Sequence, residues 1–167
     1  LMPRITDLHK NAYFVTLAGF ALAFWIFKKR KQALAYILTL AVSLVLSDMI
    51  SYRLIKPVVD RSRPADSGLL VTLRTDHHSG KSFPSNHATN IFAASTVLST
   101  AFPAAQVFFV LIAVAVAFSR IYVGVHFPLD VFAGSVLGIS CAYFSLYLSR
   151  KFLRNWFNAT KVPENSK

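Results

Sequence analysis

The sequence predicts an all-α fold: a polytopic membrane bundle of about five transmembrane helices with a short interfacial helix at its N-terminus. Of the 167 residues, 54% are hydrophobic and 15% are charged, and the mean hydropathy is +0.49, which does not describe a soluble globular domain. Several long runs also contain no Asp, Glu, Lys or Arg, and a hydrocarbon layer of about 30 Å requires apolar runs near 20 residues. These runs are residues 11–27, 32–47, 88–119 and 131–149.

The run 88–119 is too long for one span, because a helix rises by about 1.5 Å per residue. Pro103, flanked by alanines, is the expected break, since a proline inside a helix removes a hydrogen bond and clashes with the preceding turn. The predicted spans are therefore residues 11–27, 32–52, 85–101, 104–123 and 128–149. The first run could instead be a signal sequence, but the basic cluster 28–31 follows it in place of a small-residue cleavage site, so we expect a retained span.

The chain is predicted to be a single membrane domain over residues 1–167. Residues 1–10 mix apolar and charged side chains, which favours an interfacial segment. Residues 53–84 form the expected outer loop, and residues 155–167 form a polar tail. The lone cysteine, Cys141, falls in the middle of a predicted span, so neither a disulfide nor a thiolate metal site is expected.

The distribution of basic residues predicts the orientation. With five spans, the cluster 28–31 and the basic residues of 150–154 lie on one side, which the positive-inside rule makes cytoplasmic. The loop 53–84 and the turn near His126 then face outward. That loop is basic too, against the rule, and two explanations stay open: binding of an anionic substrate, or contact with anionic headgroups.

Two other classes of protein fit the sequence poorly. The net charge of +11 could suggest nucleic-acid binding, but the charges are divided between two membrane faces and no soluble basic stripe is present, so no nucleic-acid partner is expected. A transporter would carry charges or broken helices at the membrane midplane. Here Pro103 lies at a turn and the titratable residues gather at one face.

Three polar clusters fall at the outward ends of the predicted spans, so distant parts of the chain can bring them to one site. In the last cluster, a histidine stands four residues before an aspartate and follows an arginine, which supplies a nucleophile, its orienting partner and an anion clamp. The clusters are Lys56, Arg63 and Pro64; Pro84, Ser85, Asn86 and His87; and Ser119, Arg120, His126 and Asp130.

In order and spacing these clusters resemble the tripartite signature of the type 2 phosphatidic acid phosphatase superfamily, which includes membrane lipid phosphatases. The resemblance runs from Lys56 to Asp130, and the surrounding spans look like the family's helical core. One departure is Asn86, where the family usually has Gly. Asn is, after Gly, the residue best able to adopt a left-handed backbone, so the loop is expected to keep its shape with an amide in or beside the site.

The resemblance implies roles for the clustered residues. His126 attacks phosphorus and forms a phosphohistidine, while Asp130 holds the other ring nitrogen. His87 protonates the leaving alkoxide and later activates water. The positions implied for phosphate binding are Lys56, Arg63, Ser85, Asn86 and Arg120.

The remaining polar residues receive weaker expectations. Arg74, His77, His78 and Lys81 are possible substrate contacts. Asp60 and Arg61 are expected to be solvated loop charges. For Asp48 two roles stay open: support of Arg53 or of a cation of the site, or a part in catalysis. No cluster of Asp, Glu and His has metal-ligand spacing, and the adjacent histidines of an extended segment point oppositely, so we predict no metal and no cofactor.

The expected function is hydrolysis of a phosphate monoester or diphosphate on the headgroup of an anionic phospholipid or lipid A type substrate. By resemblance the chain looks most like bacterial lipid A phosphatases, in particular a 1-phosphatase, placed as a monomer in the inner membrane with its site facing the periplasm. Undecaprenyl diphosphate phosphatase and phosphatidylglycerophosphate phosphatase activities stay open. A non-catalytic lipid-binding or transport protein is the alternative from another class, and loss of a histidine or of Arg120 would be its signature.

Overall fold

The structure is a computed structural model that describes residues 19, 27–68, 71–75 and 80–154. The chain divides into two compact units, residues 1–35 with 153–167 and residues 36–152, and the second unit holds all three polar clusters. The predicted interfacial segment 1–10, the polar tail 155–167 and most of the first predicted span, 11–27, lie outside the described residues, as do His77 and His78.

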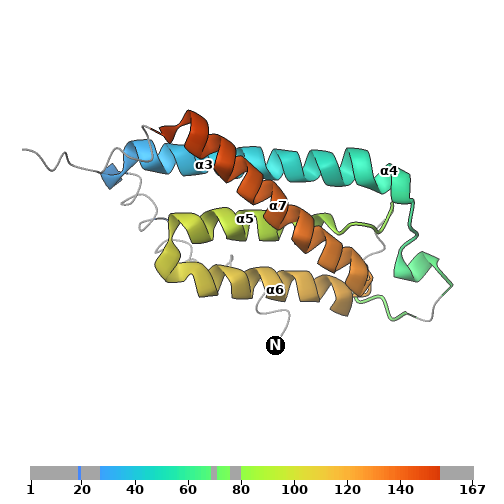
Figure 1. Cartoon of the computed structure of the whole chain (residues 1–167). Helices are drawn as coiled ribbons and strands as arrows, with labels where there is room; N and C mark the ends of the chain where they lie inside the picture. Colours follow the sequence, from blue (N-terminus) through green and yellow to red (C-terminus); the bar gives the residue numbers. More distant parts are fainter. Residues whose placement is uncertain (1–18, 20–26, 69–70, 76–79, 155–167) are drawn as a thin grey trace, which may run out of the picture. The chain divides into compact units, whose positions relative to one another are not determined.

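Every regular element in the described part of the chain is helical (Figure 1). Helix α5 ends at Ala101 and α6 begins at Gln106, with Pro103 between them, so the predicted break is confirmed. The elements are α3 (Arg30–Asp48), the π-helix η2 (Met49–Ile55), α4 (Lys56–Val59), the 3-10 turns η3 (Pro64–Asp66) and η4 (Pro103–Ala105), α5 (Asn86–Ala101), α6 (Gln106–Tyr122) and α7 (Pro128–Phe152).

Three stretches of the described helices are long and apolar enough to cross a membrane: Arg30–Asp66, Pro103–Tyr122 and Pro128–Phe152. Helix α5 has 16 residues and is shorter than these. Large apolar side chains cover the outer faces of the helices; Val107, for example, is 72% exposed and Phe132 is 67% exposed. In water such faces would be costly, whereas lipid tails solvate them.

The interior of residues 36–152 is built from small side chains. A Cβ atom at Gly134 would lie 2.6 Å from the Ser85 carbonyl oxygen, and one at Gly138 would lie even closer to the carbonyl oxygen of Thr89. Glycine therefore lets α7 approach the backbone of α5, as is common where helices pack within lipid. The close approach places the first turn of α7, with Asp130, beside Ser85, whose backbone N–H donates to the Asp130 carbonyl oxygen over 3.0 Å.

The helical path that begins with α3 continues beyond residue 52, where the second predicted span ends, so the loop predicted for residues 53–84 starts later than predicted. The chain stays helical through η2 and α4, because Pro57 lies in the first turn of α4, where its missing N–H is tolerated. Asp60 ends the helix in the left-handed conformation, with φ of 49°. The extension carries Lys56 on a helix toward the other polar clusters.

Candidate active site

His126 and Asp130 meet at the junction between α6 and α7. His126 precedes α7, and Asp130 lies in its first turn. The Asp130 carboxylate is fully buried and accepts the backbone N–H of Phe127 over 2.8 Å, so it caps the start of the helix. Its Oδ2 lies 3.6 Å from His126 Nδ1. His126 itself is not helical, so it is this capped turn, and not a shared helix face, that brings the two side chains together across the spacing of four residues.

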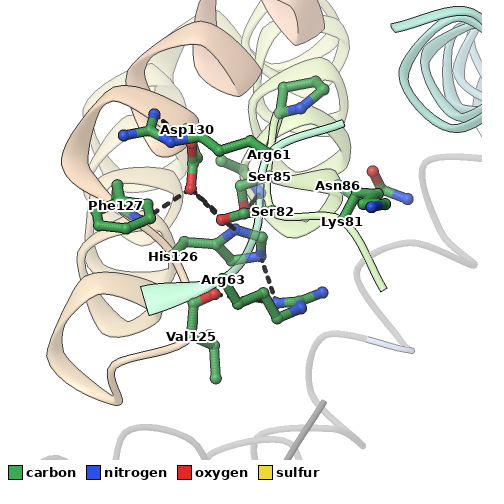
Figure 2. A network of polar contacts seen from close by, with 12 residues as sticks. Arg61, Arg63, Lys81, Ser82, Ser85, Asn86, Val125, His126, Phe127 and Asp130 are labelled. Carbon is green, nitrogen blue, oxygen red and sulfur yellow. Dashed lines mark hydrogen bonds and ion pairs between the residues drawn. The ribbon is translucent and has the colours of Figure 1, made fainter. Parts of the chain in front are cut away.

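Two residues beside Asp130 were missed as site residues from the sequence. The Ser82 hydroxyl donates a short hydrogen bond to Asp130 Oδ2 and lies 3.5 Å from His126 Nδ1. Arg61 Nη1 donates to Asp130 Oδ1 over 3.0 Å, and the guanidinium lies 4.2 Å from the centroid of the Phe127 ring. Figure 2 shows both groups converging on the carboxylate.

The expectation that Arg61 is a solvated loop charge is therefore wrong. A buried carboxylate needs a cation and hydrogen-bond donors, and the half-buried Arg61 supplies both. A signal was present in the sequence, because Arg61 stands two residues before Arg63 and Ser82 stands two residues before Pro84. Alternate residues of an extended segment share a face, so each can accompany its motif into the site.

Arg63 faces the second ring nitrogen of His126. The Arg63 guanidinium donates to two carbonyl oxygens, from Nη1 to that of Val125 over 3.0 Å and from Nε to that of Gly80 over 3.1 Å. The same Nη1 lies 3.5 Å from His126 Nε2 (Figure 2). A guanidinium has no acceptor, so this arrangement favours the tautomer in which Nε2 carries the lone pair and Nδ1–H points to Asp130.

The surroundings of His126 also favour its neutral form. Burial, above all, lowers the pKa of His126 below its ordinary value of 6.5, and the charges of Arg63 and Lys56 act in the same direction. The hydrogen bond and charge of Asp130 oppose this shift without reversing it. A neutral imidazole with an unprotonated Nε2 is a competent nucleophile at neutral pH.

Hydrogen bonds made by Lys56 and Ser85 hold the segment that carries the second cluster in place. The buried Lys56 ammonium donates to the carbonyl oxygens of Lys81 and Pro84 over 2.8 and 3.0 Å. The Ser85 hydroxyl accepts the Ala88 N–H over 3.5 Å and caps α5. The N-terminus of α5 therefore lies next to the His126 and Asp130 pair, where backbone N–H groups favour an anion.

Asn86 and His87 open the first turn of α5. His87 is exposed and lines a cavity of about 440 Å³. Asn86 has the right-handed backbone of an α-helix. Among the non-glycine residues that the structure describes, positive φ occurs at Asp60 and not at Asn86. The left-handed backbone that an asparagine is able to adopt is therefore not used at Asn86, because the preceding Ser85 already caps the helix. The Asn86 amide accepts the Ser51 hydroxyl over 2.6 Å and points away from the His126 ring (Figure 2).

The other predicted contacts have partners of their own. Arg120 is half-buried in the last turn of α6, and its Nε donates to the hydroxyl oxygen of Ser119 over 3.3 Å. The Arg74 guanidinium donates to the Tyr122 carbonyl oxygen over 3.0 Å and lies over the Tyr122 ring, and the Lys81 ammonium pairs with Asp60.

Asp48 differs from its expectation as well, since its carboxylate accepts the Asn90 amide over 3.0 Å. The described residues contain no group of three or more His, Cys, Asp or Glu that could hold a metal ion.

A neutral buried imidazole flanked by a carboxylate and by guanidinium groups, at one end of an apolar helical bundle, defines a class of site suited to nucleophilic attack on an anionic group. The sequence profile of the PAP2 superfamily matches residues 32–154, and the chain belongs to that superfamily.

Relatives and solved structures of this superfamily resemble the chain over most of its length. The lipid A 4'-phosphatase of Bacteroides thetaiotaomicron is 28% identical over 80% of this chain and 62% of the relative. The lipid A 1-phosphatase of Rhizobium johnstonii is 35% identical over 60% of this chain and 42% of the relative. The crystal structure of Aquifex aeolicus LpxE matches with a TM-score of 0.62 and 30% identity, covering 87% of this chain and 83% of that one. The chain thus spans 62% or less of the length of these two curated relatives.

Proposed function

We propose that this protein is a membrane lipid phosphatase that hydrolyses a phosphate monoester or diphosphate through a phosphohistidine on His126, without a metal or cofactor. The single observation that carries the proposal is the setting of the His126 ring, whose Nδ1 faces Asp130 and Ser82 while Nε2 faces Arg63. Membership of the PAP2 superfamily supports it.

The geometry suggests how the reaction runs. His126 Nε2 attacks phosphorus, and the bond between phosphorus and the leaving oxygen breaks as His87 donates a proton to that oxygen. The developing imidazolium is stabilised through Nδ1–H by Asp130. His87, now neutral, takes a proton from a water molecule, which attacks the phosphohistidine and releases phosphate and the neutral His126. Lys56, Arg63 and Arg120, with Ser85 and the N-terminus of α5, stabilise the phosphoryl oxygens, whereas the Asn86 amide, which accepts the Ser51 hydroxyl, lines the cavity beside His87.

For the substrate we propose a lipid A type molecule, phosphorylated at its 1-position. The support is the similarity to proteins described as lipid A phosphatases. Undecaprenyl diphosphate and phosphatidylglycerophosphate are the competing substrates, because the residues that would hold the phosphoryl group contact only what all three share. Arg74, His77, His78 and Lys81 are proposed as contacts to the part of the headgroup beyond the phosphate.

We also propose the setting of the enzyme. A single domain over residues 1–167 crosses the bacterial inner membrane about five times and works as a monomer, with its site at the periplasmic face. The apolar stretches and the basic segments at residues 28–31 and 150–154 support this topology.

The test is phosphate release by the purified protein in detergent, with lipid A, undecaprenyl diphosphate and phosphatidylglycerophosphate compared side by side. We expect turnover to survive excess chelator and to be highest with lipid A. His126→Ala is the matched control and should reduce turnover to background. A protein that binds these lipids but releases phosphate from none of them would support the non-catalytic alternative.

A further inference from the structure

The cavity beside His87 carries polar groups that the proposed chemistry does not use. Its lining consists of Asp48, Asn86, His87, Asn90, Ile91 and Val116. A second cavity, of about 480 Å³, adjoins it and shares Asp48 and Asn86, adding Tyr52 and Arg53 to the lining. The helix faces around these cavities are apolar and fit a lipid environment. The carboxylate of Asp48 and the amides of Asn86 and Asn90 in the cavity lining therefore need an explanation.

Asp48 is the least expected of these groups. It ends α3, within a stretch apolar enough to cross a membrane, where an ionised side chain is expensive and marks function more often than structure. Its Oδ1 accepts the Asn90 Nδ2 over 3.0 Å, an interaction with a neutral amide. An amide neutralises no charge, so the carboxylate keeps its capacity to accept further donors.

Asn90 and Asn86 extend the same polar wall along α5. The Oδ1 atom of Asn90 is buried and has no hydrogen-bond partner, which is costly unless a ligand supplies a donor. Asn86 is fixed by the hydroxyl of Ser51, a residue of the π-helix η2. Helices of this kind occur frequently at functional sites, because the wider turn shifts the side chains that follow.

The Asp48 carboxylate and the Asn90 Oδ1 atom are the acceptors with unused capacity in this wall, so they would bind a group that brings donors. His87 lines the cavity and is the proposed proton donor to the leaving oxygen, so the part of the substrate that carries this oxygen extends into the cavity. We infer that Asp48, Asn90 and Asn86 form a headgroup subsite that selects lipids whose phosphate is attached to a group bearing hydroxyl or N–H donors, such as an amino sugar.

This inference rests on the proposed function for the placement of the leaving oxygen, and Asp48 is its specificity-determining residue. The test compares Asp48→Asn with the unaltered protein on two phosphate monoesters: a phosphorylated amino-sugar lipid, and phosphatidic acid, whose headgroup beyond the phosphate has no donor. We expect Asp48→Asn to lower kcat/KM for the amino-sugar lipid about tenfold and to change that for phosphatidic acid less than twofold, because a hydrogen bond to a charged acceptor is lost only with the first.

Arg150→Gln is the control, since it removes a charge in the last turn of α7, outside the lining of both cavities, and should leave the ratio between the two substrates unchanged. An equal loss with both substrates for Asp48→Asn would show a general structural role, and no loss with either would show that the wall is not used. Either outcome overturns the inference.

A binding measurement separates this inference from the proposed function. In the His126→Ala background, both intact lipids can be titrated into detergent-solubilised protein without turnover. Adding Asp48→Asn should weaken binding of the amino-sugar lipid about tenfold and leave phosphatidic acid unaffected. If the unaltered protein hydrolyses neither lipid, the phosphatase proposal fails, while this preference in binding still decides for or against the subsite.

Discussion

The interactions of Asp130 show how one buried carboxylate organises the site. It accepts from Ser82, from Phe127 N–H and from Arg61, and it faces Nδ1 of His126. The carboxylate therefore orients the histidine only while its own position is fixed by the other partners. We regard Arg61 and Ser82 as positioning residues, since they act on His126 through Asp130.

Replacing Arg61 tests this arrangement. Arg61→Gln removes the cation from Asp130 Oδ1, so we expect kcat/KM to fall about tenfold. Because the carboxylate then carries less compensated negative charge, the pKa of His126 should rise, and the acid limb of the kcat/KM profile should move to higher pH. Arg61→Lys should restore the limb in part. A loss of activity with no movement of the limb would point to misfolding instead.

Arg150→Gln is the control for this series, because it removes the same charge from the last turn of α7, far along the helix from Asp130. Its activity and pH profile should match those of the unaltered protein.

The pH dependence follows from the lowered pKa of His126. Since the proposed nucleophile must be neutral, we expect activity to require that His126 lose its proton, and the acid limb of kcat/KM should lie below 6.5. Asp130 acts to raise this pKa, so Asp130→Asn should move the limb further toward acid pH and lower the maximum by roughly a hundredfold or more. A limb above 6.5 in the unaltered protein would contradict the buried, neutral imidazole.

At the scale of helices, the site depends on the approach between α5 and α7. Gly134 and Gly138 permit this approach. The hydrogen bond from the Ser85 N–H to the Asp130 carbonyl oxygen shows that the N-termini of the two helices lie close together. Since the Ser85 cap and the Asp130 carboxylate are on different helices, a displacement of one helix separates groups that must act together.

Gly138→Ala should therefore force the helices apart. An added Cβ would clash with the Thr89 carbonyl oxygen, a backbone atom that yields only if the helix moves. We expect a loss of stability of about 1–3 kcal/mol and a fall in activity at temperatures where the protein remains folded. Thermal unfolding in detergent measures the first effect. Ser140→Ala, on the exposed side of the same helix, should change neither quantity.

For the whole molecule, the sequence predicted the helical class and the break at Pro103, because uncharged apolar runs and a proline report directly on lipid burial and helix continuity. It also predicted the pairing of His126 with Asp130. It did not predict Arg61 or Ser82, since charge and hydroxyl groups in a loop look solvated until a buried carboxylate is seen to face them. The helical extension through Lys56 was missed, because the second span was predicted to end at residue 52 and the residues beyond it were assigned to a loop.

The proposed topology can be tested with introduced cysteines, because Cys141 is buried. Ala65 and Ala104 are both exposed, and the five-span arrangement puts the first outside and the second in the cytoplasm. In whole cells, a membrane-impermeant thiol reagent should label Ala65→Cys and not Ala104→Cys. The reverse pattern would place the site on the cytoplasmic side.

The most direct test of the central claim is to trap the covalent intermediate. Protein mixed with a lipid carrying a radioactive phosphate is denatured with alkali within one turnover, because a phosphohistidine survives alkali and is lost in acid. We predict an alkali-stable, acid-labile label on the peptide that contains His126, and no label on His126→Ala. Turnover by the unaltered protein without any such label, or near-normal turnover by His126→Ala, would contradict nucleophilic catalysis by His126.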